Sequence, residues 1–311
     1  MHHSDNPGRL KKSWFLTKCA VKTITVDKKL ILITVVWAFI FLVAVILAFY
    51  GLINDPGNHL WLGKVKTQTG WITNGSNVHL SKFGYLYIIV ALLILLFITT
   101  LLRATVTYHA IKRFKGDDPS IRDILKKVTK RSGSLLSFTL FSYTVGYILY
   151  RFTKRFSFMG LMLASLLVNT TWKVASFFAV PVIVTSDKPI NPINVTKQSL
   201  NVFKKMWGES IALSIGMGFL AATSLLLYIG FLIIFFYIVK HISMTSSINY
   251  VLNDLAVFGF FVYFAACNMI GSLVKAALYH FGTSGEAPAN FNKNILQQAF
   301  TTKDAKKVFN I

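Results

Sequence analysis

The chain has 311 residues, of which 54% are hydrophobic and 14% are charged, and its mean hydropathy is +0.56. This composition excludes an ordinary soluble domain and a disordered chain. The net charge of +22 comes from basic residues that crowd the ends of apolar runs, which excludes a nucleic-acid-binding face. We therefore expect an all-α, polytopic helical membrane protein.

Residues 1–29 form a basic N-terminal segment. Within it, Leu10, Trp14 and Val21 alternate with lysines at helical spacing. This pattern predicts an amphipathic helix at the inner membrane surface. Such a helix anchors the topology, or it binds lipid headgroups or a partner protein.

Six apolar runs are candidate membrane spans, because a helix needs about 20 apolar residues to cross the hydrocarbon layer. The runs are 30–53, 85–102, 135–150, 158–184, 211–239 and 255–279. They predict a six-helix transmembrane domain over 30–282 and a C-terminal tail over 283–311. The third run is short, and whether it and the fourth cross the membrane fully stays open.

The distribution of basic residues predicts the orientation. With the N-terminus inside, 25 of the 33 Lys and Arg residues fall on the cytoplasmic side. This asymmetry predicts a multi-pass protein of the bacterial inner membrane with both termini in the cytoplasm. Arg151, Lys154 and Arg155 disagree, because a six-span arrangement puts them outside. Either these side chains snorkel to an interface, or the two helices around them do not cross fully.

Two connecting segments carry structural signals. The outer loop, 54–84, has the composition of a short hairpin or of a loop that rests on the interface. The cytoplasmic segment, 103–133, places Asp118 and Pro119 where a helix cap and first turn belong.

The helix that follows this cap is expected to be amphipathic, with Ile121, Leu125 and Val128 on one face. Its basic side chains are candidate contacts for anionic lipids: Arg122, Lys126, Lys127, Lys130 and Arg131. Topology anchoring is the simpler interpretation of these charges, and binding of a specific lipid headgroup or of a partner is the alternative.

One lysine falls inside an apolar run. Lys173 lies on a polar stripe with Asn169 and Ser176, and Asn268 falls at a similar expected depth in the last span. These four residues form a candidate intramembrane polar site that attracts an anion or a lipid phosphate. Alternatively, the amine bonds to neighbouring carbonyls and hydroxyls or reaches an interface.

No enzymatic pattern is visible in the sequence. There is no His-x-x-x-His motif, no paired-carboxylate motif and no Gly-Lys-Ser/Thr phosphate loop. Cys19 and Cys267 lie in unrelated contexts, so neither a disulfide framework nor a metal site is indicated. We expect no catalytic residue, no cofactor and no metal.

The order of several motifs resembles an uncharacterised family of multi-spanning prokaryotic inner-membrane proteins, a domain of unknown function. The motifs are KRFKGDDPS (112–120), Trp172, FAVP (178–181), KMWGE (205–209), AALYH (276–280) and GTSGEAP (282–288). The similarity extends from Trp14 to about Phe300, and it is more distant to the membrane domain attached to some bacterial glycerophosphodiester phosphodiesterases. The resemblance implies a six-helix membrane domain and assigns no activity or site residue.

We therefore expect a non-enzymatic helper, scaffold or lipid-interacting component of the membrane. The alternative is a transporter or channel for an anion or amphiphile. For this protein we expect anionic membrane lipids as partners, and partner proteins or a second copy of the chain are further alternatives.

Overall fold

The computed structural model describes residues 9–53, 65–67, 70–72, 82–154, 171–205, 223–235, 237, 246–288 and 291. Its helices are α1 (Arg9–Val26), α2 (Lys28–Ile53), α3 (Lys82–Phe114), α4 (Ile121–Lys130), α5 (Ser132–Lys154), α7 (Ala179–Thr185), α8 (Pro192–Lys205) and α10 (Ser246–Ser284). Residues Thr223–Phe235 form a further helix. Strands β1 (Val65–Thr67) and β2 (Gly70–Ile72) pair as an antiparallel hairpin, with Lys66 opposite Trp71.

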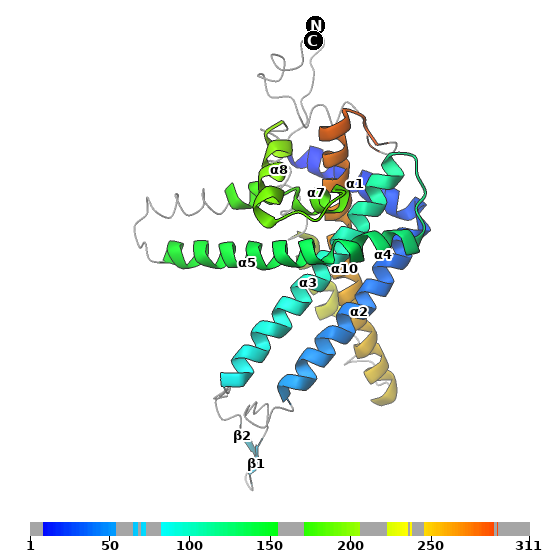
Figure 1. Cartoon of the computed structure of the whole chain (residues 1–311). Helices are drawn as coiled ribbons and strands as arrows, with labels where there is room; N and C mark the ends of the chain where they lie inside the picture. The colour runs from blue at the N-terminus through cyan, green and yellow to red at the C-terminus, as the bar shows by residue number, and fades with distance from the viewer. Residues whose placement is uncertain are drawn as a thin grey trace.

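Three helices, α2, α3 and α10, are long and apolar enough to cross a membrane. They pack against one another (Figure 1). Contacts fix their directions: Arg103 of α3 bonds to Asn268 of α10, and ten residues or more further along both helices the rings of Phe114 and His280 lie 5.9 Å apart. Helices α3 and α10 therefore run in the same direction.

Helix α2 runs in the opposite direction. Its Thr34 hydroxyl lies 2.9 Å from the sulfur of Met269, and its Phe41 ring, two turns later, stacks on Phe264 at 5.4 Å between centroids. Higher residue numbers on α2 therefore contact lower residue numbers on α10, so the two helices are antiparallel. The predicted helical fold is confirmed and these three helices are candidate membrane spans, whereas the count of about six spans is not confirmed.

The buried core lies at one end of the three long helices. We call this end the head; it comprises α1, α4, α7, α8, the first turns of α2 and α5, residues 102–114 of α3 and residues 265–284 of α10. Phe178, Leu273 and Ile183 are among its fully enclosed side chains. The far halves of α2, α3 and α10 instead expose large apolar side chains, such as Leu47 at 62%. This division is typical of helices that face lipid over part of their length.

Helix α5 does not run alongside the other long helices. Figure 1 shows it crossing α3 and extending sideways from the head. It packs on α3 and α8, and its exposed side includes Tyr143, Tyr147 and Tyr150. The run 135–150 is apolar enough to suggest a span from the sequence, but its Ser, Thr and Tyr content suits a helix that lies in a membrane interface.

The fourth expected span, 158–184, is described from Thr171 onward. Its helix is interrupted by a turn at 176–178, after which α7 begins and buries Val182, Ile183 and Val184 in the head. The Phe178 N–H donates to the Ser199 hydroxyl at 3.0 Å, which ties this turn to α8. The second half of the apolar run is therefore core rather than lipid-facing surface.

The fifth expected span, 211–239, is described mainly over Thr223–Phe235. This helix lies beside the exposed half of α10, where the hydroxyls of Ser224 and Tyr263 are 2.7 Å apart. Tyr228 stacks on Tyr263 and donates to the Ala256 carbonyl at 3.4 Å. The contacts on α10 move towards lower numbers as this helix advances, so the two helices are antiparallel.

Candidate functional site

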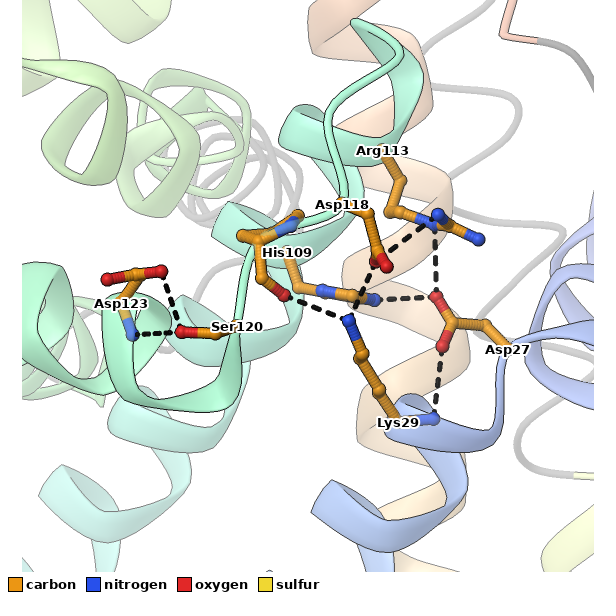
Figure 2. A network of polar contacts seen from close by, with 8 residues as sticks. Asp27, Lys29, His109, Arg113, Asp118, Ser120 and Asp123 are labelled. Atoms are coloured by element: carbon orange, nitrogen blue, oxygen red, sulfur yellow. Dashed lines mark hydrogen bonds and ion pairs between the residues drawn. The ribbon is translucent and has the colours of Figure 1, made fainter.

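The head contains a group of charged residues where α1, α2 and α3 meet, which we call the hub: Asp27, Lys29, His109, Arg113 and Asp118 (Figure 2). Asp27 lies between α1 and α2 and caps α2, because its Oδ1 accepts the Lys29 N–H at 3.0 Å. Its Oδ2 lies 2.6 Å from His109 Nε2 and 3.4 Å from Arg113 Nε. One buried carboxylate thus fastens the start of α2 to the end of α3.

A second carboxylate extends the hub to the turn after α3. Asp118 Oδ1 pairs with Lys29 Nζ at 2.8 Å and with Arg113 Nη1 at 3.2 Å. Lys29 also donates to the Pro119 carbonyl at 3.2 Å. The hydrogen bond from Lys29 is the main cause that lowers the pKa of the Asp118 carboxyl, and the charges of Lys29, Arg113 and His109 lower it further.

The turn between α3 and α4 explains the residues of the KRFKGDDPS motif. Gly116 adopts φ +88°, which ends α3 in a left-handed conformation, and the Asp117 N–H returns to the Lys112 carbonyl. The cap of α4 is Ser120, whose hydroxyl accepts the Asp123 N–H at 3.2 Å. The prediction of the cap at Asp118 and Pro119 is therefore wrong by two residues, because the Asp118 side chain is taken by Lys29 and Arg113.

Asp123 completes this cap. The Ser120 hydroxyl donates to the Asp123 carboxylate at 2.6 Å, and this bond is the main cause that lowers the pKa of the Asp123 carboxyl. A carboxylate in the first turn also interacts favourably with the helix dipole. The hub and this cap are thus built from neighbouring charged and polar groups that pair with one another.

Helix α4 separates its side chains differently from the sequence prediction. Ile124 and Val128 are buried against the core, whereas Leu125 is 45% exposed, so of the predicted apolar face of Ile121, Leu125 and Val128 only Val128 is buried. The outward side carries Arg122, Lys126 and Lys130, all exposed.

The other two basic residues of the predicted lipid-contact set lie elsewhere. Lys127 Nζ donates to the Ser186 carbonyl at 3.3 Å and lies 3.9 Å from Asp187. Arg131 is buried, at 1% exposure, at the junction with α5. Its Nε and Nη1 atoms have no hydrogen-bond partner among the described residues. Three of the five predicted side chains are therefore placed to meet a surface.

Helix α1 also presents an apolar and basic exposed side. Leu16, Cys19 and Ala20 are buried in the head, whereas Trp14 is 49% exposed, with Lys18 Nζ 5.3 Å from its ring centroid. The amphipathic character expected for this segment is thus present. The predicted apolar residue Trp14 lies on the outward side of the helix.

Within the predicted intramembrane polar site, the only described contact joins neighbours on one helix, because the Ser176 hydroxyl lies 3.4 Å from the Lys173 carbonyl. Lys173 is exposed on the helix that starts at Thr171, and the Ser176 hydroxyl bonds to the Trp172 carbonyl at 2.8 Å. Asn169 lies outside the described residues. Asn268 is bound elsewhere, to Arg103.

Sequence reasoning missed this arginine. Arg103 Nε and Nη2 donate to Asn268 Oδ1 at 3.0 and 2.8 Å, and Asn268 Nδ2 donates to the Phe264 carbonyl at 2.9 Å. Lys275 lies seven residues after Asn268 on the same face of α10, and its Nζ is 4.8 Å from the Phe177 ring centroid. The signal that could have placed Arg103 inside the helix is the lack of a helix-breaking residue between the apolar run and Gly116.

Comparison with known proteins finds one family. Residues 80–289, about two thirds of the chain, match a family of unknown function (DUF6159). The match includes α3, α4, α5, α7, α8 and most of α10, and it leaves out Asp27 and Lys29 of the hub. No curated protein and no solved structure matches the chain.

Proposed function

Because this chain belongs to the DUF6159 family, whose function is unknown, we propose a function from the structure: a non-enzymatic, lipid-interacting protein of the bacterial inner membrane. Its head rests on anionic headgroups of the cytoplasmic leaflet through Arg122, Lys126 and Lys130. One observation carries this proposal. Helices α4 and α5 both pack on α3, and α5 crosses it at the end of the buried core, where the exposed apolar half of α3 begins (Figure 1).

The directions of the helices support four crossings in place of six. Since α3 and α10 run the same way, the chain between them must return across the membrane. The helix Thr223–Phe235, antiparallel to α10, lies in the right place for that return. With α2, α3 and α10 as the other crossings, both termini lie on one side.

The positive-inside rule favours this arrangement. When α5 lies in the interface, Arg151, Lys154 and Arg155 join the cytoplasmic side and no longer conflict with the rule. The basic residues that remain outside are four of 33: Lys64, Lys66, Lys82 and Lys240. The head, with its basic α1 and α4, then faces the cytoplasm.

The outward side of α4 has the chemistry of a membrane-surface helix. Each basic residue near an anionic leaflet contributes about 1 kcal/mol, so Arg122, Lys126 and Lys130 together contribute about 3 kcal/mol. The exposed Leu125 lies among them and adds apolar contact. The distant resemblance to a membrane domain attached to glycerophosphodiester phosphodiesterases is compatible with such a role, and it supplies no catalytic residue to this proposal.

The transport alternative has weaker support. Its pathway was predicted around Lys173, which is exposed and contacts none of the other predicted site residues through its side chain in the described part of the chain. Asn268 alone meets another polar group of a long helix, Arg103.

Lipid preference tests the proposal. The full-length chain is purified in neutral detergent, and native mass spectrometry measures retention of phosphatidylglycerol against phosphatidylcholine. We expect Arg122→Gln/Lys126→Gln/Lys130→Gln to lower the preference for phosphatidylglycerol by at least tenfold, because three charges are removed. The matched control, Lys115→Gln/Lys197→Gln/Lys204→Gln, removes three exposed charges elsewhere on the head and keeps the preference. Equal loss in both variants would reject a specific role for α4.

A further inference from the structure

Arg103 of α3 and Lys275 of α10 are two positive charges on packed neighbouring helices, and neither has a negative partner among the described residues. Arg103 meets α10 at Asn268, two turns before Lys275 on the same face of that helix. Arg103 bonds to the neutral amide of Asn268, and Lys275 lies over the ring of Phe177. Neither side chain forms an ion pair in the part of the chain that the structure describes.

The distribution of carboxylates leaves this pair without a nearby counter-charge on its own helices. The sequence has no Asp or Glu in 56–116, 124–186 or 255–285, so α3, α5 and α7 carry none, and α10 carries only Asp254, near its start. In the hub, by contrast, Lys29 and Arg113 each pair with a carboxylate. The chain thus neutralises the cations of the hub and leaves Arg103 and Lys275 uncompensated within the described residues.

The depth of Arg103 indicates where a counter-charge would come from. Residues 83–102, which precede it on α3, carry no charge and extend about 30 Å at 1.5 Å per residue. That length matches the hydrocarbon thickness of a bilayer. In the proposed orientation, Arg103 therefore lies where the hydrocarbon of the cytoplasmic leaflet meets its phosphate layer. An unpaired cation at this depth is costly and is typical of a functional site.

The free donors suit a phosphate. Asn268 occupies Arg103 Nε and one N–H of Nη2, which leaves both N–H groups of Nη1 and the second of Nη2. Lys275 Nζ supplies up to three more donors, and Phe177 holds its position. A planar guanidinium and an ammonium group each bind phosphate oxygens by charge-assisted hydrogen bonds.

We propose that Arg103 and Lys275, with Asn268 orienting the guanidinium, bind one phosphate group of a phospholipid of the cytoplasmic leaflet. This inference rests on the proposed membrane role and gives it a specific headgroup site, separate from the diffuse charge of α4. Inorganic phosphate carries the same chemistry and is the other source of such a ligand.

Retention of defined lipids tests the site. The full-length protein is delipidated in neutral detergent, and binding of phosphatidylglycerol, diacylglycerol and inorganic phosphate is measured by native mass spectrometry and by the shift of the melting midpoint. We expect one phosphatidylglycerol to bind tightly and diacylglycerol to bind at least tenfold more weakly. Arg103→Gln and Lys275→Gln should each lower the phosphatidylglycerol affinity about tenfold or more, because each removes a charge-assisted hydrogen bond.

Three controls separate the explanations. Lys173→Gln removes an exposed lysine without described side-chain contacts and should retain the lipid. Arg103→Lys keeps the charge and should bind better than Arg103→Gln. Inorganic phosphate that protects the wild type but neither Gln variant supports the site and identifies a free oxyanion as its ligand.

Other outcomes overturn the inference. Unchanged affinity in both folded Gln variants, or equal retention of diacylglycerol, would show that no phosphate is bound by these residues. If either Gln variant fails to fold, the comparison of Arg103→Lys with Lys173→Gln still decides, and equal binding in those two rejects a guanidinium-dependent site. The α4 triple variant reports the proposed surface contact independently, so each proposal can fail without the other.

Discussion

The Nε2 atom of His109 lies 2.6 Å from Oδ2 of Asp27, and this contact joins segments 82 residues apart in the chain. The imidazole is fully buried and the Asp27 side chain is 10% exposed. Because the same carboxylate caps α2 and pairs with Arg113, it connects the α1–α2 junction to the end of α3.

Removal of this carboxylate should destabilise the head. We expect Asp27→Ala to lower the free energy of unfolding by about 3 kcal/mol, because it leaves His109 and Arg113 without their partner and α2 without its cap. Asp27→Asn retains the cap and should cost less. The measurement is the melting midpoint in detergent, with Asp187→Ala, whose side chain is fully exposed, as the control. Equal midpoints for Asp27→Ala and Asp187→Ala would contradict a structural role for the hub.

Acid should weaken the turn between α3 and α4. The folded pKa values of Asp118 and Asp123 lie below their ordinary value of 3.8, so their contacts stabilise the fold above that pH. This contribution is lost as the pH falls through the lowered pKa values. A pH series of melting midpoints should therefore fall below about pH 4, and Asp118→Asn/Asp123→Asn should show a smaller fall. An identical fall in wild type and variant would assign the acid sensitivity to other groups.

Two glycines provide a matched test of backbone conformation. Gly116 has φ +88° and open space where a Cβ would lie, so Gly116→Ala should cost about 1 kcal/mol through backbone strain alone. Gly133 lies in the first turn of α5 with equally open surroundings and no positive φ. Gly133→Ala should be neutral or slightly stabilising. The measurement is the melting midpoint of both variants. Similar decreases in the two would show that the positive φ of Gly116 is not the cause.

Helix α5 offers a direct test of topology. In a chain whose two native cysteines are replaced, Arg151→Cys and Lys130→Cys should both react with a membrane-impermeant maleimide only from the cytoplasmic side. A six-span arrangement requires the opposite result at Arg151, with labelling in intact cells from outside. Lys66→Cys, in the hairpin between α2 and α3, is the reference for the outer side.

The long helices could be predicted from the sequence because their apolar runs need no tertiary information. The predicted runs 30–53, 85–102 and 255–279 fall within α2, α3 and α10. The extension of α3 to Phe114 was missed, because Arg103 marks the end of hydrophobicity while nothing breaks the helix before Gly116. Charge therefore indicated where the apolar run ends and said nothing about where the helix ends.

The remaining differences have a tertiary origin. Hydropathy cannot distinguish α5 from a span, because the same apolar side chains suit an interface, a core or lipid. Whether Leu125 is buried depends on which side of α4 packs against α3 and α5. In the structure that side carries Ile124, so Leu125 stays exposed. Asn268 was recognised as polar and deep, but its partner Arg103 lies 165 residues away, and spacing along the chain cannot reveal such a pair.

The position of α10 has a consequence for how the protein is made. Helices α1, α2 and α3 all pack against α10, the last helix that the structure describes. During synthesis, more than a hundred residues are added after α3 before α10 begins to leave the ribosome. Over that time the sides of α1, α2 and α3 that pack on α10 stay uncovered. Until then, Met269 and its neighbours cannot cover Thr34 and Leu30, and the nascent chain offers this uncovered surface to insertion factors and to proteases alike.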